Sequence, residues 1–319
     1  MMTNKHPQKL HKRQQGLTLI EIMVAVTISL FLMGGVIQIF MGSKQTYRLQ
    51  DAAARVQESG RFAINFLVKD IRMADFWGCQ GNFPNVNNHL NNSASNPFDL
   101  SEGGISGTDS GDDTVPDTLN LFGGVSSGIG INATNVNAAS FQLTTVNHGL
   151  ADFDYILATD CETADLLEVT NANSGSTLTV VGNTGAVGSG PGNATGPGFA
   201  YSADGGARMY TFQGTTYSVA AGSSGEPSLF RTINGGTPQE LVEGVENMQI
   251  LYGEDTDNDD AANIYVDAGS VTNMNRVMSI RVTLTIRSVE DNVVATQNSG
   301  DYRLRRTFST TTTVRNRVS

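Results

Sequence analysis

The stretch of sequence that decides the fold reads Arg13-Gln14-Gln15-Gly16-Leu17-Thr18-Leu19-Ile20-Glu21 and continues as an apolar run to Met41. Residues 1–16 are polar and basic, with four cations and no acid. Residues 17–41 carry a single ionisable side chain, Glu21, and at about 1.5 Å rise per residue such a helix could cross a hydrocarbon core of about 30 Å. The basic flank predicts a cytoplasmic N-terminus and a C-terminal bulk beyond the membrane.

Two ordinary explanations compete for this stretch, a secretory signal and a plain N-terminal anchor. A secretory signal places a small-residue cleavage site after its apolar region, and residues 34–43 offer only weak candidates. An anchor leaves Glu21 unexplained, because an acid inside an apolar run is costly in lipid and marks a functional site. The carboxylate therefore needs a partner.

The amino-acid composition limits the functions expected of the rest of the chain. The sequence has 20 Lys and Arg against 31 Asp and Glu, and loss of the basic leader would take the net charge from -11 to -15. An exported domain this acidic is not expected to bind nucleic acid through a broad basic surface. Thirty-five glycines with abundant Asn, Ser and Thr point to a turn-rich β fold.

After the apolar run, the helical pattern continues on one face to about residue 76. Its apolar positions recur every three or four residues at Leu49, Ala53, Val56, Gly60, Ala63, Leu67 and Ile71, and we expect Phe62, Phe66, Met73 and Phe76 to widen the stripe. The sequence predicts one helix over about residues 17–76. Its first half would lie in the membrane and its second half would pack under a globular domain.

The remainder reads as loops and strands. Residues 82–136 lose all periodicity and predict surface loops with a few short strands. Strand-like runs follow at 141–146, 155–158, 166–170, 177–181, 210–219, 228–233, 241–252 and 303–315, and the clearest alternation covers 278–287. The expected architecture is α+β, with an antiparallel sheet wrapped on the C-terminal half of the helix.

The chain has two cysteines, Cys79 and Cys161. In an oxidising compartment an even pair predicts a disulfide, which would tie the end of the helix to the sheet. Two buried free thiols are the alternative.

Candidate chemistry is sparse. Asp255, Asp257 and Asp259 alternate like the start of a calcium loop, but Asp260 and Val266 stand where such a loop has Gly and Glu. A solvated acidic turn is the competing interpretation. No catalytic zinc motif is present around the histidines, and we expect no enzyme activity.

Gly16-Leu17-Thr18-Leu19-Ile20-Glu21 resembles the prepilin signal of type IV pilins and type II secretion pseudopilins, with Leu17 in place of the commoner Phe. The resemblance implies cleavage between Gly16 and Leu17 by prepilin peptidase and N-methylation of Leu17. It also implies that Glu21 pairs with the N-terminal ammonium of a neighbouring subunit in the fibre.

Segments 57–63, 70–74, 228–231, 240–245 and 308–317 resemble PilW-type minor pilins in particular, as do the surroundings of both cysteines. The resemblance implies a type IV pilin-like fold and a structural subunit at or near the fibre tip. Its partners would be other minor and major pilins and an inner-membrane assembly platform. The subunit would start in the inner membrane with a periplasmic domain and end at the pilus surface. The implied parts are a leader (1–16), a membrane half of the helix (17–41), an amphipathic half (42–78), a loop-rich β region (79–240) and a C-terminal antiparallel sheet (241–319).

Three alternatives stay open. The chain could be a minor pseudopilin of a type II secretion system, which shares the leader. The β domain could be an adhesin with a ligand of its own. A hydrolase would need Ser126 as its nucleophile. The surrounding sequence Gly124-Val125-Ser126-Ser127-Gly128 lacks the strand-to-helix context of a nucleophile elbow.

Overall fold

The computed structural model describes residues 16–79, 85–91, 96–125, 128–173, 175–181, 190–294 and 300–318. One long helix and two β-sheets make up this part of the chain, so the α+β expectation is confirmed. The elements are α1 (Leu19–Met73), β1 (Asn85–Asn88), β2 (Ile105–Thr108), β3 (Thr118–Gly124), β4 (Ile129–Asn135), β5 (Ser140–Leu143), β6 (Tyr155–Thr159), β7 (Thr163–Asn171), β8 (Leu178–Val181), β9 (Arg208–Ala221), β10 (Pro227–Ile233), β11 (Gln239–Glu243), β12 (Val245–Glu254), β13 (Ile264–Val266), β14 (Val277–Arg287) and β15 (Arg305–Thr313).

Contacts divide the chain into two compact units, residues 1–51 and residues 52–319. Helix α1 contributes to both. In the first unit its side chains are exposed throughout residues 16–47. In the second unit, one face of the helix is buried by Ala52, Val56, Gly60, Ala63, Leu67 and Ile71. The spacing of three or four residues is the one the sequence predicts, because such positions share a helix face.

The predicted stripe is wider than the buried face. Leu49, Phe62 and Met73 remain 39%, 53% and 53% exposed, so their assignment to the packed stripe was wrong. At the centre of the buried face, a Cβ added to Gly60 would overlap the ring of Phe308 in β15. The helix and the sheet therefore approach each other at a position that only glycine fits without rearrangement.

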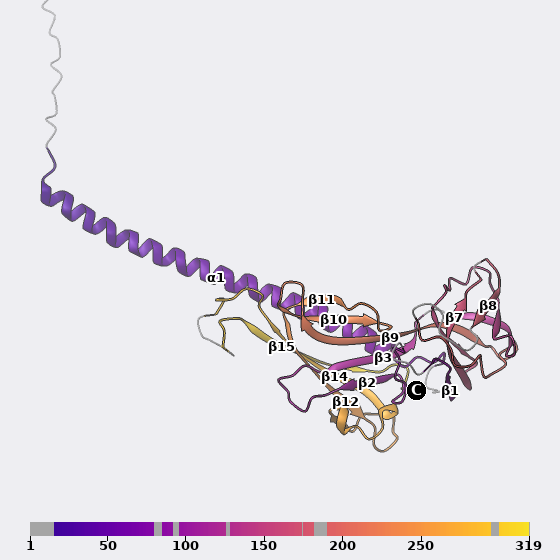
Figure 1. Ribbon diagram of the computed structural model, residues 1–319. Coiled ribbons are helices and arrows are strands. Elements are labelled where there is room, and N and C mark those ends of the chain that lie inside the picture. The colour runs from indigo at the N-terminus through magenta and orange to yellow at the C-terminus, as the bar shows by residue number, and fades with distance from the viewer. Residues whose placement is uncertain are drawn as a thin grey trace, which may run out of the picture. The chain divides into compact units, whose positions relative to one another are not determined.

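Strand β9 organises the larger sheet. It pairs with β10 and β3 along its C-terminal part and with β4 and β6 along its N-terminal part. Its side chains reach three separate cores, because Met209 packs in one, Tyr210 and Phe212 in a second, and Tyr217 in the core beneath α1. Figure 1 shows β1, β7 and β8 gathered at one end of this domain.

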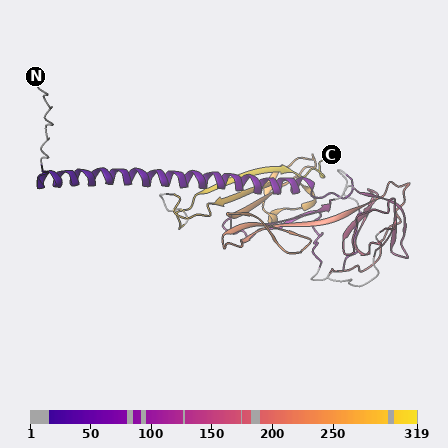
Figure 2. The same cartoon turned by 90° about the horizontal axis from the view of Figure 1, so that it is seen from above.

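The smaller sheet has the order β13-β12-β14-β15, and each neighbouring pair is antiparallel. The predicted alternation is confirmed over residues 280–287, where Ile280, Val282, Leu284 and Ile286 are buried. It fails at its start, because Ser279 is buried and Met278 is only half-buried. These side chains join the core that holds the C-terminal half of α1. Figures 1 and 2 show this half of the helix running along the strands.

Three details differ from the sequence expectation. The region predicted as surface loops with a few short strands contains β3, which lies in the interior, with five of its residues buried. At the end of α1 the backbone N–H of Asp75 donates to the carbonyl of Phe122 in this strand. The single strand predicted over 241–252 is two strands, because Gly244 takes a φ of +86° between β11 and β12. The large sheet is also not wholly antiparallel, since β1 runs parallel to β7.

Candidate functional site

Helix α1 begins with a side-chain cap at Thr18. The Thr18 Oγ1 accepts the backbone N–H of Glu21 at 3.3 Å, and the Thr18 hydroxyl lies 3.5 Å from Glu21 Oε2. A threonine followed three residues later by a glutamate is the capping-box pattern. The carboxylate of Glu21 is also placed at the positive end of the helix dipole. These two contributions give Glu21 a local structural role that the sequence analysis missed, although the Thr-x-x-Glu spacing was visible.

The predicted processing residues Gly16 and Leu17 lie just before this cap, outside the helix. Leu17 is 73% exposed, and the large apolar side chains that follow it to Met41 are at least half exposed. This first part of α1 is long and apolar enough to cross a membrane. Apolar surface on this scale is stable in water only when another body covers it.

The C-terminal end of α1 is held by a cluster that the sequence did not predict, which we name the helix-end cluster (Asp75, Trp77, Asn316 and Arg317). Asp75 lies two residues after the end of α1 and has a φ of 60°. Its Oδ1 accepts the indole N–H of Trp77 at 2.7 Å and the backbone N–H of Gly104 at 2.9 Å, and its Oδ2 contacts Arg317 Nε. The side chains of Arg317 and Asp75 are only 4% and 6% exposed, so this is a buried ion pair.

Asn316 completes the cluster by capping the helix. Its side-chain N–H groups donate to the carbonyls of Met73 and Ala74 at 3.2 and 2.8 Å. Carbonyls at a helix C-terminus lack intrahelical partners and need such donors. Residues more than 240 positions apart in sequence therefore fix the end of α1 to the segment that follows β15, the last strand of the smaller sheet.

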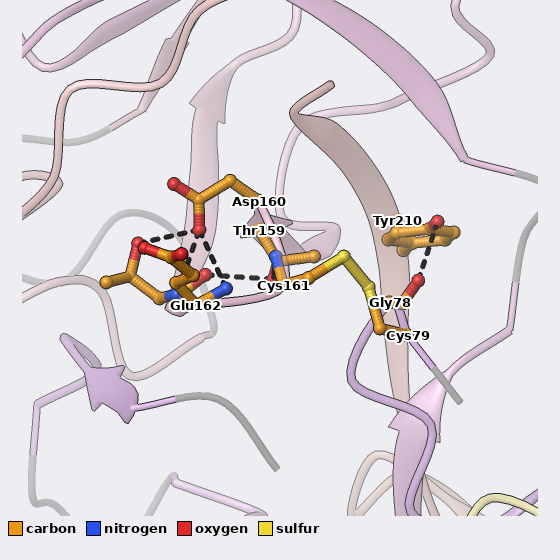
Figure 3. Close-up of a disulfide and its surroundings, with 8 residues drawn as sticks. Gly78, Cys79, Thr159, Asp160, Cys161, Glu162 and Tyr210 are labelled. Carbon is orange, nitrogen blue, oxygen red and sulfur yellow. Dashed lines mark hydrogen bonds between the residues drawn. A yellow bond between two sulfur atoms is a disulfide. The ribbon is translucent and has the colours of Figure 1, made fainter. Parts of the chain in front are cut away.

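Cys79 and Cys161 are joined in a disulfide, with Cα atoms 5.6 Å apart (Figure 3). Cys79 follows the helix end, and Cys161 lies in the turn between β6 and β7. The turn is shaped by Asp160, whose Oδ1 accepts the backbone N–H groups of Glu162 and Thr163 at 3.1 and 2.9 Å. The bridge links the segment after the helix to the larger sheet, as the sequence analysis expected of a disulfide.

A second polar cluster lies around His89, for which the sequence suggested no partner. His89 Nε2 is 2.7 Å from Asp165 Oδ1, and Nδ1 is 2.6 Å from the hydroxyl of Thr195. The other oxygen of Asp165 accepts the backbone N–H groups of Gly198 and Phe199. His89 and Asp165 are buried, so the cluster fastens residues 195–199 to β1 and β7. Its members are far apart in sequence, and no local pattern could have found them.

The acidic loop places oxygen atoms of Asp255, Asp257 and Asp259 within 4.8 Å of one another. Asp255 is buried, and its carboxylate accepts the backbone N–H groups of Asp257, Asn258 and Asp260 at 2.7–3.1 Å. Burial alone would raise the pKa of Asp255, but these donors together lower it. Asp260 adopts a φ of 62°, the conformation for which a calcium loop uses Gly. Carboxylates so arranged suit a hard cation, and calcium binding stays a prediction.

The other sequence candidates do not form a site with these clusters. His148 is buried, and its Nδ1 accepts the backbone N–H of Leu150 at 3.2 Å. Ser126 lies outside the described residues, as do positions 1–15 of the leader.

Comparison with known families gives two matches. Residues 11–37 match the prokaryotic N-terminal methylation motif, and residues 216–316 match the family described as Type IV Pilus-assembly protein W. No curated protein and no solved structure gives a significant match. The first match covers the capped start of α1, and the second covers most of the strands that pack against its C-terminal half. Together the two matches support a minor pilin that takes part in type IV pilus assembly, similar over residues 216–316 to the PilW family.

Proposed function

We propose that this subunit acts by association alone, through the first half of α1, and has no enzymatic activity. The observation that carries the proposal is the exposed apolar surface from Leu17 to Met41, which begins at the Thr18 cap. Before assembly the lipid bilayer covers this surface, and in the fibre the helices of other pilins replace the lipid.

In this proposal Gly16 and Leu17 are the two sides of the bond that prepilin peptidase cleaves, and Leu17 becomes the methylated N-terminus. Glu21 then neutralises the terminal ammonium of a neighbouring subunit and so sets the register between helices. Glu21 lies in the first turn of α1, where the helix dipole favours a negative charge.

The location follows from the same chemistry. The domain from residue 52 onwards contains a disulfide, which is typical of an oxidising compartment such as the periplasm. We propose an inner-membrane form with a periplasmic domain, followed by incorporation at or near the fibre tip. A subunit at the fibre tip is surrounded by fewer other subunits than one within the shaft. A tip position therefore leaves more room for the many loops of this domain.

The test separates the two roles of Glu21. Glu21→Gln retains a side chain that can complete the capping box but lacks the charge, whereas Glu21→Ala loses both. We expect both variants to stay in the membrane fraction and to be absent from sheared fibres in immunoblots. Glu58→Gln, at an exposed acid further along α1, is the matched control and should be incorporated normally.

Normal incorporation of Glu21→Gln would overturn the charge-pairing role and leave only the cap. A deletion strain that loses secreted enzymes while its fibres stay intact would instead favour the type II secretion assignment. Gly16→Val should keep the leader attached, visible as a slower-migrating band.

A further inference from the structure

Charge is unevenly distributed along this chain. Residues 79–270 contain 2 Lys and Arg against 23 Asp and Glu, whereas residues 52–78 together with 271–319 contain 12 against 6. The second group comprises the C-terminal half of α1 and strands β14 and β15. One part of an acidic domain is therefore basic, and that part is where helix and smaller sheet meet.

Several arginines in and beside the smaller sheet are neutralised within the domain. Arg287 and Arg303 contact Glu226 at 2.7 and 2.9 Å, and Arg305 contacts Glu246 and Asp301 at 2.6 Å each. Arg61 and Arg306 differ from these, because within the described ranges neither has a carboxylate at salt-bridge distance, and both are exposed. Two unneutralised guanidinium groups remain in one small region.

Both arginines line the same depression, the helix–β15 groove, which has a volume of about 490 Å³ and is formed by Gln57, Arg61, Arg305, Arg306, Thr307 and Phe308. Gln57 and Arg61 are four residues apart and so share one helix face. Arg306 and Phe308 pair with Ile286 and Leu284, whose side chains are buried, so Arg306 lies on the face of β15 that looks toward the core and helix. The groove lies beside Gly60, where the helix and Phe308 of β15 approach closely.

Strand β15 adds backbone donors and acceptors to the groove. It lies at the edge of the smaller sheet, and in the described part of the chain it pairs only with β14. An edge strand presents unpaired N–H and C=O groups that an extended peptide can join. The groove therefore combines the guanidinium groups of Arg61 and Arg306 with the open edge of β15.

We propose that the helix–β15 groove binds an extended acidic segment of another protein subunit, whose carboxylates pair with Arg61 and Arg306. A guanidinium group matches a carboxylate with two parallel hydrogen bonds. Two neighbouring like charges without a counter-ion also favour an incoming anion. A nucleic acid fits less well, because a long polyanion would be repelled by the 21 excess negative charges of residues 79–270.

This inference adds a binding site to the assembly role proposed above. It rests on that role in one respect, the identification of the partner as another subunit. Binding at the groove can be measured on the isolated full chain, without a fibre. Failure of Glu21 variants to assemble and failure of the groove to bind are therefore separate results.

The test uses the full chain in non-ionic detergent micelles and a short synthetic peptide in which aspartate and threonine alternate, carrying a neutral fluorescent label. Fluorescence anisotropy should show binding that weakens as salt is raised. We expect Arg61→Gln and Arg306→Gln each to weaken binding about tenfold, since each removes a charge-assisted contact. A peptide with asparagine in place of aspartate should bind at least about tenfold more weakly.

Arg72→Gln is the matched control, because it removes an exposed cation from the same helix outside the groove, and it should bind the aspartate peptide as the parent does. Unchanged Trp77 fluorescence would show that the variants are folded. Equal binding by the two groove variants and the parent would overturn the proposal, as would no binding by the parent. Tighter binding of a short DNA strand, lost in the same two variants, would overturn it in favour of a nucleic-acid site.

Discussion

Loss of the buried ion pair at the end of α1 should destabilise the domain far more than loss of a surface pair. In Arg317→Gln the carboxylate of Asp75 stays buried without its cation. Breaking one side of a buried pair costs about 3–5 kcal/mol, and we expect a value near the lower limit of about 3 kcal/mol, because Trp77 and Gly104 still donate to Asp75. Arg317 also donates to the carbonyls of Met274 and Val277, and these acceptors would lose their donor.

The assay is urea unfolding of the full chain in detergent, followed by tryptophan fluorescence. Trp77 is the single tryptophan of the sequence and is 1% exposed, so the signal comes from the helix-end cluster itself. Asp75→Asn should also be destabilising. The double variant should lose less than the sum of the two single variants, with a coupling of about 1–3 kcal/mol, because no buried charge is left unpaired.

Arg55→Gln is the comparison, since Arg55 and Glu290 form a 3.6 Å pair whose side chains are 66% and 43% exposed. Exposed pairs contribute about 0.2–1 kcal/mol. If Arg317→Gln shifts the unfolding free energy no more than Arg55→Gln does, the buried pair does not hold the helix end and the reasoning fails.

Three further predictions concern other contacts of the domain. Gly60→Leu should destabilise it by about 1–3 kcal/mol in urea unfolding through overlap with the Phe308 ring, and Phe308→Ala in the same chain should restore part of the loss; additive losses would contradict this. Replacing Cys79 and Cys161 by Ser should cost about 4 kcal/mol on the chain-entropy model for residues 82 positions apart, and an unchanged midpoint under oxidising conditions would count against it. Burial raises the pKa of Asp117 from 3.8 to about 6. Between these two values the folded chain keeps a proton on Asp117 that the unfolded chain releases. The contribution of protonated Asp117 to the free energy of unfolding is therefore present below about pH 4 and is lost as the pH rises through 6. Asp117→Asn should therefore be more stable than the parent near neutral pH and equal to it near pH 4, as urea midpoints at the two pH values would show.

Local patterns predicted the elements that are defined by neighbouring residues. Helix α1 follows from the spacing of Val56, Gly60, Ala63 and Leu67, and β14 follows from strict alternation, because each pattern places apolar side chains on one face. The width of the helical stripe was overestimated, since periodicity shows which side of a helix is apolar but not how far the sheet reaches around it. Phe62 satisfies the pattern and remains exposed.

Long-range polar contacts could not be predicted in the same way. Asp75 and Arg317 are 242 positions apart, and His89 and Asp165 are 76 apart. A single Asp or His in a loop has no periodicity, and its partner is determined only when the strands between them have paired. The position and burial of β3 were not predicted for a related reason. Gly123 and Gly124 are typical of a turn, although Gly123 allows the backbone of Phe76 to approach closely.

Under the proposed function, the first half of α1 serves assembly and the second half stabilises the domain. Thr18 and Glu21 begin a segment whose side chains are exposed to residue 47, whereas the packed face begins at Ala52 and ends at the helix-end cluster. Glu21→Gln should therefore leave the Trp77 unfolding curve unchanged even though the subunit is lost from fibres. Arg317→Gln should shift that curve and reduce incorporation only through the amount of folded protein. A Glu21→Gln variant whose unfolding midpoint moves as far as that of Arg317→Gln would mean that the first half of the helix stabilises the domain, and its loss from fibres could then not be assigned to a missing charge pair.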